Sequence, residues 1–396
     1  MAEEILETQK PAKPPIWNDP VYRALFFQAL VLGGVIFLGY TLVSNTLHNL
    51  ERQGIASGFG FMKTTAGFSI LMNLIDYTES DSYFRAFVVA LLNTLLVAAI
   101  GIFFATIFGF LVGVARLSNN WLLSKMAAVY IETLRNIPLL LQIFFWYFGV
   151  LRQLPQPKQS VMLWDSFFLN NRGLYSPAPV PEEGFAFIIW SIVAAIIIIY
   201  FMARWAHKRQ ADTGQQFHTV YVSIGIIIGL PFIAAVLTGF PMTWEYPTLQ
   251  GFNYKDGLSL IPELVSLSLA LSLYTATFIA EIVRAGITAV SHGQTEAAYA
   301  VGLRPGPTLR LVVIPQALRV IIPPLTSQYL NLTKNSSLAA AIAYPDLVLV
   351  FAGTVLMQTG QAVEVIAITM GVYLTISLLI SAFMNWYNNK MALVER

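Results

Sequence analysis

The strongest constraint on this fold is a series of long apolar segments that recur along almost the whole chain. Eight of them approach or exceed the roughly 20 residues that an α-helix needs to cross a bilayer. They span 24–43, 86–115, 127–150, 185–203, 219–240, 260–285, 320–342 and 363–388. Barrel strands would be about ten residues long and would alternate apolar with polar residues. We therefore predict an all-α, polytopic membrane protein with about eight transmembrane helices.

The composition agrees with a bilayer as the surroundings of this chain. Charged residues make up 11% of the 396 residues, whereas a soluble domain carries about 25%. A net charge of +2 offers no basic surface for nucleic acid. The sequence has no cysteine, and its four histidines are scattered. We therefore expect neither a disulfide nor a metal site.

Lysine and arginine set the expected orientation, because they concentrate in cytoplasmic connections. With the N-terminus inside, fourteen of these residues fall on the cytoplasmic side and seven on the opposite side. The first apolar stretch begins only near Ala24 and is too long for a cleaved signal. We expect both termini in the cytoplasm. The external connections at 44–85, 151–184 and 241–259 are expected to be too small to form a domain.

A short segment at 291–307 carries the signals of a small cytoplasmic helix. Ser291 and Gln294 have the spacing of a capping box at its start. Gly302 suits the left-handed position after its end, and Pro305 prevents continuation. The alanine-rich middle would let another molecule approach closely. Such a helix either docks a partner or lies on the membrane as an amphipathic linker.

Charged residues within membrane spans are costly and indicate function by default. Glu132 and Arg135 are three residues apart, as are Glu281 and Arg284, so each pair can meet on one helix face. Both pairs lie near the expected cytoplasmic ends of their spans. They either neutralise themselves at the interface or brace the inner mouth of a transport pathway.

Polar residues also interrupt the seventh apolar stretch. Lys334, Asn335 and Ser336 stand together within it. An unwound polar break at membrane depth is tolerated where it faces a cavity or other protein. We expect either such a break, which would line a pathway, or a simple helix end.

The segment at 291–307 and the residues after it resemble the EAA loop of ATP-binding-cassette (ABC) import permeases. In that pattern Glu-Ala-Ala precedes a glycine by three residues, and nine more residues lead to Ile-x-Leu-Pro. The matching residues are Glu296, Ala297, Ala298 and Gly302, followed by Val312, Val313, Ile314 and Pro315. The resemblance implies that Glu296 bonds to an ATPase and that Ala297 and Ala298 stay small for close packing. Gly302 would turn the chain back to the membrane.

Residues 130–142 and 280–287 resemble stretches of the histidine/glutamine-type polar amino-acid permeases. The resemblance covers about 86–151 and 258–390, which together hold the five spans of a type I ABC importer permease core. The other parts resemble the long permease subunit of general L-amino-acid importers. The expected parts are 1–85 (tail, extra span and external loop), 86–151 (first part of the core), 152–257 (insertion with two extra spans) and 258–396 (second part of the core with the EAA loop).

This resemblance implies a set of partners in a bacterial inner membrane. An amino-acid substrate would arrive on a periplasmic binding protein, and a second, different permease would complete the pathway. An ABC ATPase would supply the energy, because no glycine in this chain is followed by lysine and the GxxxxGK[ST] phosphate loop is therefore absent. We expect a transport subunit with no enzymatic activity and no cofactor, with ATP bound by the partner.

A secondary transporter driven by an ion gradient is the alternative. Such carriers usually contain two related halves with matched broken helices, and the sequence contains no convincing halves. Co-purification with an ATPase separates the two interpretations.

Overall fold

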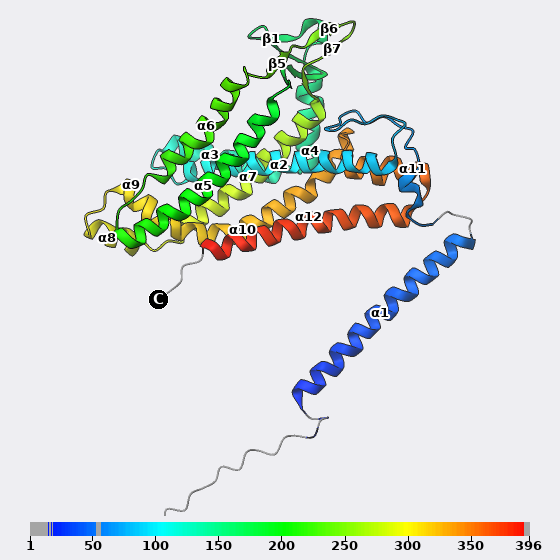
Figure 1. The fold of residues 1–396 in the computed structure, drawn as a ribbon. Coiled ribbons are helices and arrows are strands. Elements are labelled where there is room, and N and C mark those ends of the chain that lie inside the picture. The colour runs from blue at the N-terminus through cyan, green and yellow to red at the C-terminus, as the bar shows by residue number, and fades with distance from the viewer. Residues whose placement is uncertain (1–14, 16, 18, 53–56, 392–396) are drawn as a thin grey trace, which may run out of the picture.

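The computed structural model describes residues 15, 17, 19–52 and 57–391 of the chain. Seven helices in this part are long and apolar enough to cross a membrane, so the predicted polytopic helical fold is confirmed (Figure 1). They contain α1 (Pro20–Arg52), α2 (Tyr83–Arg116), α5 (Phe185–Thr213), α6 (Thr219–Leu237), α7 (Pro262–Thr288), α10 (Ile314–Asn335) and α12 (Ala362–Met391). Shorter helices are α8 (His292–Ala300), α9 (Pro305–Thr308) and α11 (Leu356–Thr359). The expected N-terminal tail at 1–14 lies outside the described residues.

The span predicted at 127–150 is not one straight helix. It consists of α3 (Trp121–Asn136) and a second helical segment that begins with α4 (Leu139–Phe144), and the two are bent by 104°. The break falls at Ile137, which is extended because the residue before a proline is disfavoured in the α region. Buried Gln142 donates hydrogen bonds to the carbonyl oxygens of Leu134 (2.7 Å) and Ile137 (2.9 Å). A side chain thus satisfies the backbone groups that the bend releases, as membrane depth requires.

The core of the bundle lies where α2 packs against α7, with α10 beside them. Every fourth residue on one face of α2 is small and buried, namely Gly101, Ala105, Gly109 and Gly113. A Cβ atom on Gly109 would lie 2.5 Å from the Cβ of Ile279. The two helices therefore approach closely enough that no side chain fits between them at this point. Small-residue faces of this kind favour van der Waals packing between membrane helices.

A buried polar cluster on α2 anchors the connection between α10 and α12. The Tyr344 hydroxyl donates to the Asn93 carbonyl at 2.9 Å, and Asn93 Nδ2 donates to the Pro345 carbonyl at 2.9 Å. The backbone N–H of Leu347 donates to Thr94 Oγ1 at 2.9 Å. These bonds satisfy polar groups that would otherwise be costly to bury.

Short strands form a layer that the sequence analysis did not predict. They are β1 (Val161–Leu163), β2 (Phe167–Asn170), β3 (Gly173–Ser176), β4 (Ala178–Pro181), β5 (Met242–Glu245), β6 (Thr248–Gln250), β7 (Asn253–Lys255) and β8 (Leu258–Leu260). One sheet has the order β1-β2-β3-β8, and β4-β5 and β6-β7 form two-stranded ribbons, all antiparallel. The connections at 151–184 and 241–259, each expected to be too small to form a domain, are joined to each other through β3-β8 and β4-β5.

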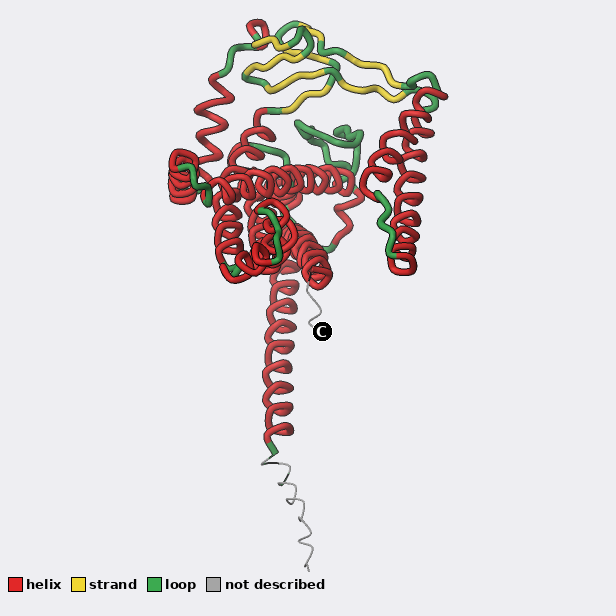
Figure 2. The backbone as a smooth tube through the Cα atoms, turned by 90° about the vertical axis from the view of Figure 1, so that its left-hand side faces the viewer, coloured by secondary structure: helices red, strands yellow, loops and turns green. Residues whose placement is uncertain are grey.

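The helices outside the core contact little of it. α5 and α6 pack against each other, and Figure 2 shows this pair to one side of the bundle, linked to it through the strand layer. α1 stands apart from the bundle in Figure 1 and projects below it in Figure 2, and none of its described side chains is buried. In α5 only Ala195 and Ala206 are buried, and in α6 no residue is.

Candidate functional site

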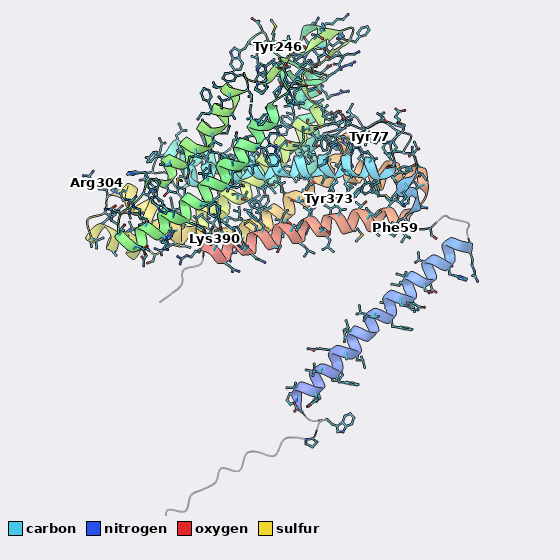
Figure 3. The ribbon with its side chains drawn as sticks, viewed as in Figure 1. Phe59, Tyr77, Tyr246, Arg304, Tyr373 and Lys390 are labelled. Atoms are coloured by element: carbon cyan, nitrogen blue, oxygen red, sulfur yellow. The ribbon has the colours of Figure 1, made fainter. Side chains whose placement is uncertain are left out.

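The EAA-like segment forms α8, which lies at one end of the bundle. Figure 3 places Arg304, just after α8, at this end together with Lys390, and Phe59 at the opposite end. Ser291 occupies the predicted N-cap position, but its hydroxyl makes no capping bond. The Gln294 amide oxygen accepts a hydrogen bond from Gln316 at 3.3 Å. The predicted capping box is therefore wrong, and Gln294 ties α8 to α10 instead.

The end of α8 is closed by the turn that Gly302 was expected to make. Gly302 has a φ of 84°, which only glycine adopts without strain. Its N–H donates to the carbonyl of Tyr299 (2.9 Å), and the N–H of Leu303 donates to the carbonyl of Ala298 (3.1 Å). This pair of bonds is a Schellman motif, which satisfies the last carbonyls of a helix. The direction in which the chain leaves α8 is thereby fixed.

The three residues of the Glu-Ala-Ala run do not share one environment. The Glu296 side chain is 70% exposed, with Oε1 3.0 Å from Nδ1 of His292 one turn earlier. Ala297 is exposed as well, whereas Ala298 is buried, and α8 packs against the segment that follows it. Ala298 therefore has to be small for packing within this chain. Glu296 and Ala297 are the members of the run that can meet a partner.

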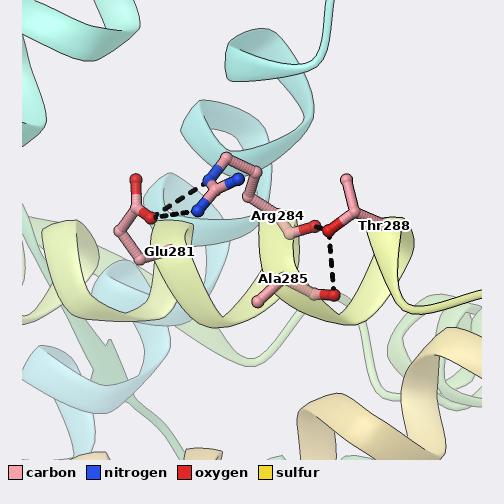
Figure 4. A network of polar contacts seen from close by, with 4 residues as sticks. All are labelled: Glu281, Arg284, Ala285 and Thr288. Atoms are coloured by element: carbon pink, nitrogen blue, oxygen red, sulfur yellow. Dashed lines mark hydrogen bonds and ion pairs between the residues drawn. The ribbon is translucent and has the colours of Figure 1, made fainter.

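Three of the predicted inner-mouth residues come together around one cavity. Arg135, Glu281 and Arg284 line a space of about 430 Å³ between α3, α7 and α10. Glu281 Oε2 accepts from both Nε and Nη2 of Arg284, each at 3.0 Å (Figure 4). The Arg135 guanidinium lies 4.9 Å from the ring centre of Phe278. One predicted pair thus forms an ion pair at the wall of a cavity.

The other predicted pair, Glu132 with Arg135, does not form. Among the described residues Glu132 has no ion-pair partner, and both side chains are exposed. Arg135 stacks on Phe278 of α7, an attraction between a cation and an aromatic face. A partner on another helix, which spacing along α3 does not reveal, decides where Arg135 points.

The polar residues near the end of α10 do not unwind it. Lys334 and Asn335 are its last residues, and Ser336 opens a tightened 3-10 turn. The hydroxyls of Ser336 and Ser337 donate to the carbonyls of Thr333 and Lys334, each at 2.7 Å. Of the two alternatives that the sequence left open, the structure shows the helix end and not an unwound break. Lys334 lines a separate cavity of about 450 Å³ beside α12.

The true break in a span lies at Ile137 and Pro138, and the sequence analysis missed it. The signal was present, since an X-Pro step inside an apolar stretch is a probable helix boundary. Gln142, the buried polar residue that supports the bend, had been noted only as part of a resemblance.

Comparisons with known proteins place these features in a family. Residues 218–393 match the model of the "Binding-protein-dependent transport system inner membrane component". The "General L-amino acid transport system permease protein AapQ" of Rhizobium johnstonii is 56% identical over 380 residues, covering 96% of this chain and 94% of the relative. The "Putative amino-acid ABC transporter permease protein YhdX" of Escherichia coli is also 56% identical, covering 96% of each.

A solved structure, "Crystal structure of an amino acid ABC transporter with histidines", is similar at a TM-score of 0.47 and 19% identity, covering 78% of this chain and 95% of that chain. The two relatives at 56% identity are aligned over nearly their full length, so the likeness includes most of the 152–257 insertion. The resemblance to the long permease subunit is confirmed. The chain belongs to the amino-acid branch of the inner-membrane permease components of binding-protein-dependent ABC transport systems.

Proposed function

We propose that this chain forms part of the membrane pathway of an importer for polar L-amino acids. A periplasmic binding protein delivers the substrate, and a separate ATPase binds and hydrolyses ATP. As a permease the chain is a transport subunit and not itself an enzyme. The observation that carries the proposal is α8, a short rigid helix whose exposed Glu296 and Ala297 stand at one end of the bundle.

The coupling role of α8 follows from how it is held. The Schellman turn at Gly302 fixes the exit of the chain from α8, and the Gln294–Gln316 bond links the start of α8 to α10. We propose that a displacement of α8 at Glu296 or Ala297 is passed to α10 through this bond and through the segment that follows α8. The bias of lysine and arginine assigns this end, and both termini, to the cytoplasm.

The cavity at Arg135 is proposed as the inner mouth of the pathway. Glu281 and Arg284 neutralise each other, so their pair closes one wall without adding net charge. Arg135 has no acidic partner among the described residues and can meet a substrate carboxylate. Lys334, with its neighbours Asn335 and Ser336, stays a candidate at the other end of α10.

A second, different permease completes the proposed pathway in the inner membrane. The exposed apolar faces of α2 and α12 offer it surface, alongside lipid. Such a heterodimer would stand over two copies of the ATPase, and ATP would reside only in those partners.

A charge reversal at α8 tests the coupling role. We expect Glu296→Lys to abolish ATPase co-purification and the ATP-dependent uptake of labelled L-glutamine in reconstituted vesicles, because the exposed carboxylate is replaced by the opposite charge. Gly302→Asp should have the same effect by straining the turn. Glu245→Lys, an exposed acid in β5, and Gly306→Asp, a glycine with open space around it, serve as matched controls.

Two outcomes would contradict this assignment. Uptake that persists without any ATPase would favour the ion-gradient carrier. Equal loss of uptake in the Glu296 and Glu245 variants would show that charge reversal acts on folding and not on docking.

A further inference from the structure

A polar cavity of about 900 Å³ lies under the strand layer, where β7 and β8 meet the first turn of α7. Its walls come from the 152–257 insertion and from the permease core, and it lies away from α8. Arg152, Arg172, Lys255 and Glu263 line it. None of the four forms an ion pair with any described residue. Asp256, the other acid at the wall, accepts a hydrogen bond from Thr248 at 2.9 Å.

The acidic group of this cavity is buried and held at one oxygen. Glu263 is only 7% exposed, and its Oε1 accepts a hydrogen bond from the Tyr147 hydroxyl at 2.7 Å. No described group donates to Oε2. A buried carboxylate normally requires a cation or several hydrogen-bond donors. Glu263 thus retains an acceptor for a cationic group that enters the cavity.

A basic group lies beside the same tyrosine. The Arg152 guanidinium is 5.7 Å from the ring centre of Tyr147, whose hydroxyl holds Glu263. Tyr147 therefore stands between a guanidinium and a carboxylate that do not pair with each other. A guanidinium fork is suited to bidentate binding of a carboxylate. The cavity thus offers a cation and an anion on either side of one tyrosine.

The insertion builds the roof of this cavity from backbone that tolerates few changes. Gly173 begins β3 with a φ of 135°, and a Cβ there would collide with the carbonyl of Leu260 in β8. Tyr175 donates to Asn253 Oδ1 at 2.9 Å, and its ring centre lies 5.2 Å from that of Tyr254. Burial raises the pKa of the Tyr175 phenol, which therefore stays a neutral donor. The strand layer is therefore held in place next to the first turn of α7 by backbone pairing and side-chain hydrogen bonds.

We propose that this cavity is a binding site for an L-α-amino acid, in which Arg152 binds the carboxylate and Glu263 binds the ammonium group. The proposal rests on the proposed function for its class of ligand, and it assigns the insertion a role in holding substrate before it enters the helix bundle. Ligand pockets are commonly about 300–1,000 Å³, so the cavity also accommodates the varied side chains of a broad substrate range.

The test is equilibrium binding to the assembled transporter in lipid nanodiscs, without ATP and without the binding protein. The probe is labelled L-glutamine. One competitor is its α-carboxamide, which lacks the carboxylate, and the other is the deaminated analogue, which lacks the ammonium group. The variants are Arg152→Gln and Glu263→Gln, which keep polar atoms in place. Lys63→Gln is the control, because Lys63 is exposed outside the cavity.

We expect saturable binding to the wild type and to Lys63→Gln, and about tenfold or greater weakening in each cavity variant. Arg152→Gln should also lose its preference for glutamine over the carboxamide. Glu263→Gln should lose its preference over the deaminated analogue. A purely structural role would weaken all three ligands equally, so the two separate losses of preference identify the contacts.

Three results would overturn the proposal. The first is wild-type binding that does not saturate. The second is unchanged binding in both variants, which would place the bound glutamine elsewhere, for example at Arg135. The third is that the two cavity variants still bind glutamine but lose uptake driven by the binding protein. That result would make the cavity a contact surface for the binding protein. Wild-type uptake that depends on ATP distinguishes these failures from a failure of the proposed function.

Discussion

The same glycine spacing occurs in two helices of this protein with opposite results. In α2, Gly109 and Gly113 face α7, and a Cβ on Gly113 would lie 2.7 Å from the Ala280 carbonyl. In α6, Gly225 and Gly229 have the same four-residue spacing, yet no heavy atom lies within 4 Å of an added Cβ. One pair is a contact between helices, and the other lies on an open face. Small residues permit close packing but do not by themselves bring a partner.

Burial separates the two regions in the same way. Just over half of the most apolar window of α7 is buried (56%), against none of the corresponding windows of α1 and α6. α1 and α6 are nevertheless more apolar than α7. Lipid is as apolar as a helix surface, so apolarity shows that a segment can lie in the bilayer and not whether it packs on protein. Core and peripheral spans should therefore respond differently to the same substitution.

The largest expected effect comes from filling the packed glycine face. Gly109→Val places a side chain where Ile279 already lies, and overpacking costs about 1–3 kcal/mol or more. We expect a large loss of folded protein in detergent, measured by size-exclusion yield and thermal unfolding. Gly229→Val in α6 meets open space and should leave both quantities close to wild type. Equal losses from the two variants would contradict the division into core and periphery.

A smaller effect is expected from the polar cluster on α2. Asn93→Ala removes the donor to the carbonyls of half-buried Met72 and buried Pro345, which then lack this partner. Such a loss costs about 1–3 kcal/mol, so the unfolding midpoint should fall by several degrees. Asn389→Ala, at an exposed position of α12, is the control and should change stability by less than about 0.5 kcal/mol. No difference between the two would show that the cluster is dispensable.

The spans could be predicted well because each one depends only on the residues within it. A helix satisfies its own backbone in lipid, so a run of apolar residues is enough to locate it. The end of α8 was equally local, since Gly302 and the residues beside it make the turn. The helix break at Ile137 is also set by a local signal, the proline that follows it. We missed it because the apolar run was long enough to predict one continuous span.

The strand layer and the cavities depend on residues far apart in the chain. Leu174 pairs with Leu260 across the whole α5–α6 hairpin, and no short pattern specifies that register. Arg135 meets Phe278 because α3 and α7 are adjacent, whereas its spacing pointed to Glu132. Sequence patterns thus singled out three charged residues that line one cavity but could not decide which of them meet.

The smallest expected effect concerns α1. Gly34→Ala adds a methyl group with nothing within 4 Å, and alanine favours a helix over glycine by up to about 1 kcal/mol. Because none of the α1 side chains that the structure describes is buried, the unfolding midpoint of the bundle should not change. Gly101→Ala in α2 brings its Cβ to 3.0 Å from Leu332 Cδ2 and should lower the midpoint slightly, since that flexible side chain can shift. A drop with Gly34→Ala as large as with Gly101→Ala would mean that α1 packs on protein through its glycine face, and it would move α1 from the periphery into the core.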